Sequence, residues 1–427
     1  MQNNMGSVKD LIRDDSLAGR LYVPPTATDF GIGAWRVSGR FSVGDLKHLI
    51  PDANIKDKAE ALTMSTAAFF EWLAYSSWIR TCYEGVMDKN GKVTDTKTLL
   101  ERGETSNIIV MRLAHVPETF CDGELKDYRT ALQKRELRCG VADIESIFRH
   151  GFPLGSSTFE KIFDAVGMKA RYETLATYDD TVQALDEIRR LVQQQGIGKF
   201  PELEKLLKKS GLKNIPNPGH VLSDIVYDTT TKFEAGGDRR IDKTEAQKLS
   251  GLSVKGYQEW AEKMFPALAR AQIAFCGERG ILNIDGKAEC VAYHGMPVVT
   301  DFCCTVDENR LMIETEIEGV KWAIPSNKEI QRAVFRQAGV YAAISEAKEM
   351  AASDGDANKW RDYVPTALRN RRIDLRAVSE HSCELMGHAI GEVANRTLGK
   401  RVFDAKPLET WTREFLPYAS KVEEEAA

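Results

Sequence analysis

The stretch from Asp228 to Arg310 constrains the fold most, because charged side chains recur in it within segments that are typical of β-strands. It begins Asp-Thr-Thr-Thr-Lys232-Phe-Glu234 and ends Thr-Asp301-Phe-Cys-Cys-Thr-Val-Asp-Glu-Asn-Arg310. Side chains two residues apart in a strand point the same way, so we expect Lys232 and Glu234 to share one face. The β-branched and apolar residues around Asp301 predict a buried strand that offers one carboxylate.

Two carboxylates, a lysine and an arginine at strand ends are what a magnesium-nucleotide site requires. Mg²⁺ takes one or two protein carboxylates and fills its other positions with phosphate oxygens and water. A Lys-x-Glu pair is also common as a solvated ion pair between strands, and an aspartate often caps a neighbouring turn. Spacing alone leaves both interpretations open.

Composition narrows the class of protein. A chain of 427 residues is long enough for two or three domains, and 43% hydrophobic with 28% charged residues is typical of soluble proteins. The net charge of −5 gives no electrostatic reason to expect nucleic acid or a membrane as partner. No apolar run approaches the roughly 18 residues of a membrane span, and the first residues lack a signal-peptide core. The eight cysteines include no CxxC pair, which favours reduced thiols in a cytoplasmic protein.

Periodicity by itself predicts only a mixture of helices and strands. We expect helices over residues 61–73, 178–195, 202–209, 254–280, 328–352 and 375–398, and a strand over 107–117. Two hairpins are expected, one turning at Asp285-Gly286 and one near Gly319. Residues 170–215 carry no chemical motif and are predicted to be a helical insertion.

A second anion-binding pattern lies upstream. Glu145-Ser-Ile-Phe-Arg149 is followed by the turn Pro-Leu-Gly-Ser156-Ser157, and Ser157-x-x-Glu160 fits a capping box at the start of a helix. Free N–H groups and the helix dipole favour an anion there, and Arg149 could contact the same anion. An ordinary capped helix is the alternative.

Several familiar motifs are absent. The glycine clusters of the first hundred residues match neither GxGxxG nor GxxxxGK[ST], which argues against a Rossmann fingerprint and a Walker A loop. His381, Glu384 and His388 lie on one predicted helical face. The pattern is not HExxH and no fourth ligand is apparent, so we expect packing or solvent-facing residues rather than a metal site.

These segments, in this order, resemble the phosphoribosylaminoimidazole-succinocarboxamide synthase (SAICAR synthetase) family, most closely its longer, archaeal-like branch. Gly6-Ser-Val-Lys9-Asp-Leu looks like the family's N-terminal nucleotide-lobe motif. Residues 40–45 are similar to its S-D-R-x-S-x-F-D element, and residues 145–157 to its E-x-x-x-R…P-x-G-S-S run. Residues 228–239 are similar to its D-x-x-T-K-x-E-x-x-x-D-R element, and residues 301–310 to its D-x-x-x-T-x-D-x-x-R element.

The chain departs from the family pattern in the nucleotide lobe. The proline and the glycine of the family's P-x-K-G loop are replaced in Ile-Lys-Asp-Lys58-Ala, and S-D-R is replaced by Ser-Gly-Arg40. These changes bear on the shape of the nucleotide and amine pockets, and thus on the identity of the substrate.

The resemblance implies an α+β protein of two lobes with ATP in the cleft between them, plus C-terminal helices, in a homodimer. It implies a nucleotide-binding lobe over residues 1–105, a central catalytic domain over 106–350 that contains the 170–215 insertion, and a helical segment over 351–427. The implied reaction condenses the carboxylate of CAIR with L-aspartate, giving SAICAR, ADP and phosphate through an acyl phosphate, with ATP and Mg²⁺.

The resemblance also implies roles for individual residues, namely those that stand at the matching positions of the family's motifs. The resemblance implies catalytic roles for Lys232, Glu234 and Asp301, and nucleotide binding by Lys9, Lys58 and Lys232. It implies Mg²⁺ ligation by Glu145, Glu234 and Asp301. The implied substrate-binding residues are Arg40, Ser42, Arg149, Ser156, Ser157, Asp307 and Arg310.

Three other functions fit the same motifs. One is a paralogous ligase that acts on another carboxylate or another amine, which the changes around residues 38–59 favour. Another is a nucleotide-binding regulatory protein without catalysis, against which the presence of Lys232, Glu234, Asp301 and Arg310 argues. A small-molecule kinase, which would leave a stable phosphorylated product, is the third.

Overall fold

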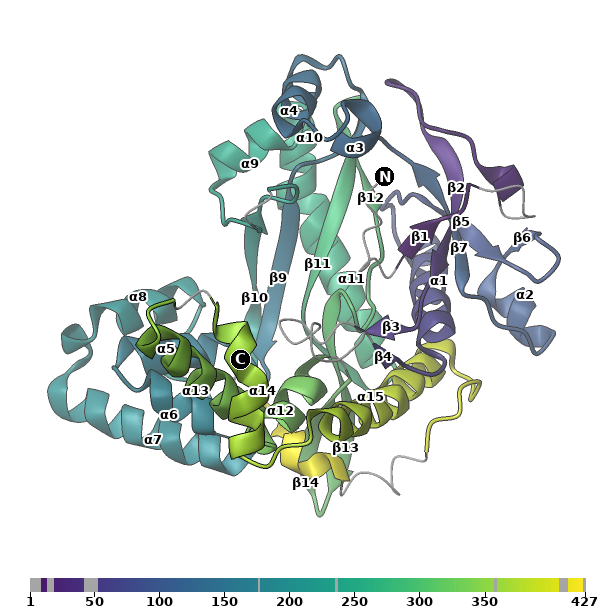
Figure 1. Cartoon of the computed structure of the whole chain (residues 1–427). Coiled ribbons are helices and arrows are strands. Elements are labelled where there is room, and N and C mark those ends of the chain that lie inside the picture. Colours follow the sequence, from purple (N-terminus) through teal and green to yellow (C-terminus); the bar gives the residue numbers. More distant parts are fainter. Residues whose placement is uncertain are drawn as a thin grey trace.

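The computed structural model describes residues 9–13, 19–41, 53–175, 177–234, 237–326, 328–356, 359–406 and 414–424. Two main sheets, both built mostly from antiparallel pairs, lie side by side with helices packed around them (Figure 1). The expected α+β class is confirmed. In the part of the chain that the structure describes, no helix is both long and apolar enough to cross a bilayer.

The first sheet has five strands in the order β1-β2-β7-β5-β6. These are β1 (Lys9–Leu11), β2 (Gly31–Val37), β7 (Ile108–Leu113), β5 (Tyr83–Met87) and β6 (Val93–Thr94). Helix α1 (Lys58–Ser76) packs against it, and α2 (Thr96–Glu101) follows β6. A separate pair joins β3 (Arg40–Phe41) to β4 (Ala53–Asn54). Strand β7 belongs to this sheet although it lies beyond residue 105, and the domain boundary there stays a prediction.

The second sheet has nine strands, with β11 (Ile281–Tyr293) at its centre. The main path runs β15 (Ser420–Lys421), β14 (Val320–Pro325), β13 (Asn309–Ile317), β11, β9 (Glu145–Phe152), β10 (His220–Thr230) and β16 (Glu423–Glu424). Strands β12 (Met296–Thr300) and β8 (Cys139–Val141) also pair with β11. β11 is therefore paired along its whole length.

The hairpin expected at Asp285-Gly286 is wrong, because both residues lie inside β11. A Cβ atom at Gly286 would meet Asn309 Nδ2 at 2.0 Å and a Phe148 ring carbon at 2.8 Å. Glycine is needed there for close approach of the neighbouring strands, not for a turn. The β11–β12 turn lies at His294-Gly295, whose positive φ angles of 50° and 78° suit a type I′ turn. The hairpin expected near Gly319 is confirmed between β13 and β14.

The insertion expected over residues 170–215 covers nearly all of α6 (Lys169–Thr174), together with α7 (Tyr178–Gln195), η3 (Ile197–Lys199) and α8 (Pro201–Lys209), and α5 (Ser157–Ala165) precedes it. That this region is an insertion stays a prediction. The apolar faces of α5 to α8 form a small core of their own, which includes Phe159, Leu185 and Leu203. The N-cap of α5 is Ser156, whose hydroxyl accepts a hydrogen bond from Thr158 N at 3.3 Å. The capping box expected at Ser157 is therefore wrong by one residue, because Ser157 is already in the helix.

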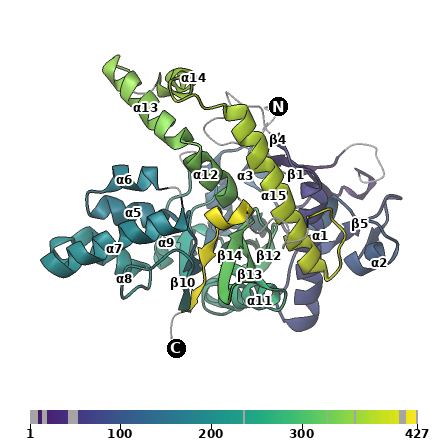
Figure 2. The same cartoon turned by 90° about the horizontal axis from the view of Figure 1, so that it is seen from below.

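Most of the remaining helices pack around the two sheets. They are α3 (Pro117–Phe120), α4 (Leu125–Lys134), α9 (Lys243–Leu249), α10 (Val254–Gln258), α11 (Phe265–Gly277), α12 (Lys328–Gln337), α13 (Val340–Ser353), α14 (Trp360–Asn370) and α15 (Leu375–Leu398). A π-helical turn over Glu259–Met264 interrupts the single helix expected over 254–280. Helix α15 lies alongside α1, while α13 and α14 pack against each other and project on a different side of the molecule from α7 and α8 (Figure 2).

Candidate functional site

Charged side chains from three adjacent strands lie on one face of the second sheet. In the register, Asp285 of β11 lies opposite Arg149 of β9 on one side and Arg310 of β13 on the other. Strand alternation places Lys287 and Glu289 on the same face as Asp285. The sequence interpretation missed these three β11 residues because it assigned Asp285-Gly286 to a turn. The signal was present as the period-two pattern Asp-x-Lys-x-Glu.

Acidic and basic groups alternate at this face. Lys9 of β1 pairs with Asp301, which directly follows β12, and its Nζ lies 3.5 Å from Glu308. Lys232 pairs with Glu289. Lys287 Nζ lies 2.9 Å from Glu308 and 2.7 Å from Glu145. We call these residues the charged cluster: Lys9, Glu145, Lys232, Lys287, Glu289, Asp301 and Glu308.

Burial and close neighbours shift the ionisation of this cluster. Burial, followed by the neighbouring carboxylate of Asp301, raises the pKa of Glu289 to about 7, although Lys232 and Lys287 act in the opposite direction. Burial alone would raise the pKa of Asp301, but Lys9 and Lys232 hold it below its usual value. Burial acts to lower the pKa of Lys9, yet the carboxylates of Asp301 and Glu308 raise it overall. The lysines therefore stay charged, and Glu289 is the group closest to neutrality.

A cavity of about 330 Å³ opens beside the cluster. Four predicted site residues line it: Glu145, Arg149, Asp307 and Arg310. Arg310 pairs with Asp285, and its Nε lies 3.1 Å from Glu329. Arg149 donates to Thr158 Oγ1 at 2.6 Å, and its burial lowers the pKa of its guanidinium group. Arg149 and Arg310, which the family resemblance assigns to substrate binding, thus line one cavity.

A second cavity of about 380 Å³ adjoins the first, with Arg310 and Arg332 in both linings. Gly155 and Ser157 line it at the start of α5, and Arg336 and Lys348 line it from α12 and α13. Ser156 is almost fully buried beneath the helix terminus. The expected Gly-Ser-Ser anion element is therefore close to Arg310.

Lys58, the first residue of α1, is only 1% exposed. Its ammonium group lies 3.1 Å from Asp307 Oδ2 and donates to the carbonyl of Arg40 at 3.1 Å. Three residues expected at the nucleotide and amine pockets thus meet through Lys58, whereas the side chain of Arg40 is exposed. Ser42, which we also expected here, lies outside the described residues.

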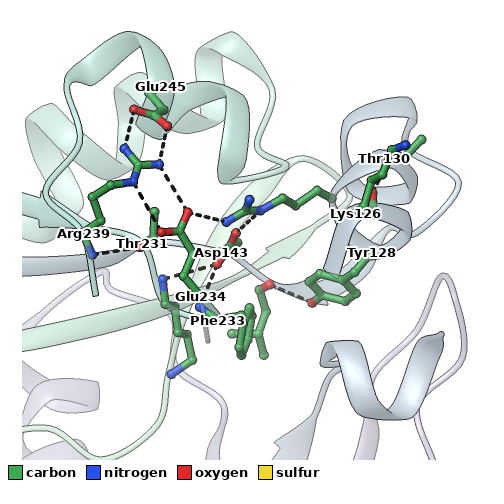
Figure 3. Close-up of polar contacts among 12 residues, drawn as sticks. Lys126, Tyr128, Thr130, Asp143, Thr231, Phe233, Glu234, Arg239 and Glu245 are labelled. Carbon is green, nitrogen blue, oxygen red and sulfur yellow. Dashed lines mark hydrogen bonds and ion pairs between the residues drawn. The ribbon is translucent and has the colours of Figure 1, made fainter. Parts of the chain in front are cut away.

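Glu234 is placed differently from Lys232. Strand β10 ends at Thr230, so the expected continuous strand through Lys232 and Glu234 is wrong. The carboxylate of Glu234 lies 3.2 Å from Arg129 Nη2 and 3.2 Å from Arg239 Nη2, and Arg239 also pairs with Glu245 (Figure 3). The carboxylate of Glu234 is thus already paired with two guanidinium groups, and the metal role expected of it stays a prediction.

The donor set fits magnesium better than a softer metal. Among the described residues, no group of three or more His, Cys, Asp or Glu side chains could hold a metal ion. Mg²⁺ needs only one or two carboxylates when phosphate and water complete its shell. The buried carboxylate of Glu289 and the half-buried carboxylate of Asp301 are neighbours, and their mutual repulsion is the kind that a divalent cation relieves.

The fold and the site define an α+β protein in which acidic and basic side chains line a cavity beside the charged cluster. No model of a known protein family matches the chain. A phosphoribosylaminoimidazole-succinocarboxamide synthase of Thermoplasma volcanium is 32% identical over 140 residues, which are 33% of this chain and 47% of that protein. The chain thus spans about half of that relative.

A second relative, from Archaeoglobus fulgidus, is named "Putative phosphoribosylaminoimidazole-succinocarboxamide synthase". It is 26% identical over 411 residues, which are 95% of this chain and 97% of the relative. By these sequence matches, the chain is similar to SAICAR synthetases, and one of the two matches extends over nearly its whole length, which confirms the resemblance.

Solved structures of the same name give low similarity scores. The SAICAR synthetase of Pyrococcus horikoshii has a TM-score of 0.40 and 14% identity, covering 71% of this chain and 82% of that one. The SAICAR synthase of Saccharomyces cerevisiae, solved with SAICAR, has a TM-score of 0.43 and 12% identity, covering 91% of this chain and 97% of that one.

Proposed function

We propose that the chain is an ATP-dependent ligase that joins the carboxylate of CAIR to the amine of L-aspartate, forming SAICAR, ADP and phosphate. The main support is the cavity where Arg149 and Arg310 meet the carboxylates of Glu145 and Asp307, directly beside the charged cluster. A site that handles a phosphate monoester, a carboxylate and a nucleotide needs this alternation of cations and acids.

The chemistry explains why so many cations are needed. A carboxylate resists nucleophilic attack because it is already anionic and has no good leaving group. Transfer of the γ-phosphoryl group of ATP to a carboxylate oxygen gives an acyl phosphate; the amine nitrogen then attacks the carbonyl carbon, the C–O bond to phosphate breaks, and the nitrogen loses a proton. The protein has mainly to position the reactants and neutralise charge.

We assign the site residues to the three substrates by where each residue lies in the site. We assign Lys9, Lys58 and Lys232 to the nucleotide phosphates, with Lys287 as an addition from the structure. Arg149 and Arg310, with the α5 terminus at Ser156 and Ser157, are assigned to the phosphate monoester of CAIR. Arg40 and Asp307 stay our assignments for L-aspartate.

Mg²⁺ would be held by Glu289 and Asp301, with Glu145 as a further candidate, and would supply positive charge between the nucleotide and the substrate carboxylate. Glu289 is proposed in addition to Glu234, because the carboxylate of Glu289 neighbours Asp301 in the charged cluster, whereas Glu234 lies between Arg129 and Arg239. The dimer that the resemblance implies stays a prediction.

One experiment tests the function. Purified protein with Mg-ATP and CAIR is given L-aspartate or a panel of other amines, and ADP, phosphate and coupled product are followed. We expect ADP release to require both CAIR and L-aspartate. Preference for another amine would identify a paralogous ligase, a persistent phosphorylated product would identify a kinase, and nucleotide binding without turnover would identify a regulatory protein.

A further inference from the structure

The backbone of the segment Lys232–Glu234 is held by a buried carboxylate that has no part in the proposed chemistry. Asp143, between β8 and β9, is 0% exposed. Its Oδ1 accepts hydrogen bonds from the backbone N–H groups of Lys232 at 3.3 Å and Phe233 at 3.0 Å. Its Oδ2 lies 2.5 Å from Arg129 Nε. Both carboxylate oxygens are thus engaged, as burial of the charge requires.

Arg129, on α4, also contacts the other end of the same segment. Its Nη2 lies 3.2 Å from Glu234 Oε1, so one guanidinium group bridges Asp143 and Glu234 (Figure 3). Next to it, the ring of Tyr128 packs edge-on against the ring of Phe233, with centroids 5.8 Å apart. Helix α4 and the β8–β9 turn therefore hold this segment from one side.

The segment needs such support because it has left the sheet. Beyond Thr230 no β-ladder fixes its backbone, apart from bonds to the residues that return at Arg239. The side chain of Lys232 nevertheless has to reach Glu289 inside the charged cluster. A small shift of the backbone would move the ammonium group out of that ion pair.

We propose that Asp143 and Arg129 are positioning residues that hold Lys232 against Glu289. The catalytic consequence rests on the proposed function, whereas the structural consequence does not. This positioning requires the negative charge of Asp143. An asparagine at position 143 could still accept hydrogen bonds from the backbone N–H groups of Lys232 and Phe233, but its N–H₂ group would face Nε–H of Arg129 and would place one donor against another.

The chain offers a matched control. Asp88, which directly follows β5 in the first sheet, is also buried; its Oδ1 accepts from Asn90 N and Lys92 N, each at 2.9 Å, and its Oδ2 lies 3.3 Å from Arg102 Nη1. Asp88→Asn makes the same change, the replacement of an arginine-paired carboxylate by an amide, far from Lys232. A general effect of losing a buried, arginine-paired carboxylate would appear equally in both variants.

The first measurement is hydrogen exchange of the full-length protein by mass spectrometry, with a fragment over residues 228–234 and one over 296–300 as internal reference. Loss of a charged hydrogen bond corresponds to about a 10- to 100-fold change in an equilibrium. We expect Asp143→Asn to speed exchange in the first fragment by about this factor, and Asp88→Asn to leave it unchanged. Unchanged exchange in Asp143→Asn overturns the proposal.

The second measurement is a double-mutant cycle on turnover with Lys232→Met. If Asp143 acts through Lys232, Asp143→Asn lowers kcat about 10- to 100-fold in the wild-type background, with little change in KM, and adds nothing in the Lys232→Met background. An equal loss in both backgrounds overturns the proposal. Should Asp143→Asn not fold, Arg129→Gln, at a side chain that is 23% exposed, replaces it in both measurements. Absence of wild-type turnover contradicts the proposed function only, and exchange then decides the positioning role.

Discussion

Replacing Glu289 by glutamine tests the assignment of the central carboxylate. Glu289 is 4% exposed, and burial together with Asp301 raises the pKa of its carboxyl from 4.5 to about 7. Glutamine has nearly the shape of the protonated acid but cannot ionise. The substitution therefore removes a buried negative charge while largely preserving the packing.

The magnitude follows from linkage between protonation and folding. The folded protein holds its Glu289 proton up to about pH 7, whereas the unfolded chain releases it near pH 4.5. The folded state binds more protons in that interval, so its stability falls as the pH rises through it. Across this pH interval, the release of the proton lowers the free energy of unfolding of the wild type by up to about 3 kcal/mol. The glutamine variant does not suffer this loss.

The assay is urea unfolding of both proteins at several pH values between about 5 and 8. We expect the free energy of unfolding of Glu289→Gln, relative to that of the wild type, to increase by up to about 3 kcal/mol as the pH rises. We expect the turnover of the variant to be at least about 100-fold lower than that of the wild type. Glu346→Gln is a control, because bonds from Asn370 and Arg371 lower the pKa of that half-buried glutamate from its usual 4.5. Its titration therefore lies below the pH range of the assay, and the stability difference between wild type and this variant should stay constant from about pH 5 to 8. For Glu289→Gln, a difference that stays constant with pH, or an enzyme that works normally, would refute the reasoning.

Three further predictions follow from the same site. Asp301→Asn should abolish turnover in a protein that still melts cooperatively by circular dichroism; normal turnover would remove Asp301 from the site. Arg149→Met should raise the KM for CAIR about 10- to 100-fold in initial-rate assays, because it removes a charged contact to phosphate, and an equal rise in the KM for ATP would contradict this location. Gly286→Ala should lower the free energy of unfolding by about 1–3 kcal/mol in urea unfolding, since its Cβ would meet Asn309 and Phe148 at 2.0 and 2.8 Å. An unchanged urea midpoint would show that the neighbouring strands move apart at no cost in stability.

Much of the helical structure could be predicted, because the signals for helices are local. The helix over Tyr178–Gln195 has an amphipathic face, an N-cap at Thr177 and a terminal glycine, and its bounds were found to the residue. The same holds for α15, which begins after Asp374 and ends before Gly399. Periodicity and capping act within a few residues, so one sequence contains them completely.

The centre of the second sheet could not be predicted in this way. Asp-Gly is a strong local signal for a turn, and only strands β9 and β13, which come from distant parts of the chain, make Gly286 a site of close approach. This one misassignment concealed Lys287 and Glu289. The expected gathering of Arg149 and Arg310 at one cavity is present, since their motifs lie on strands that the same β11 separates.

The full pairing of β11 has an evolutionary consequence. A single-residue insertion or deletion within this strand would turn Lys287 and Glu289 toward the opposite face and bring apolar neighbours to the cavity. No adjustment of a nearby loop could compensate, because partners on both edges fix the alignment. We therefore expect related chains to vary freely in the length of the α5–α8 region, which has its own core, and to preserve the spacing from Asp285 to Glu289 without gaps.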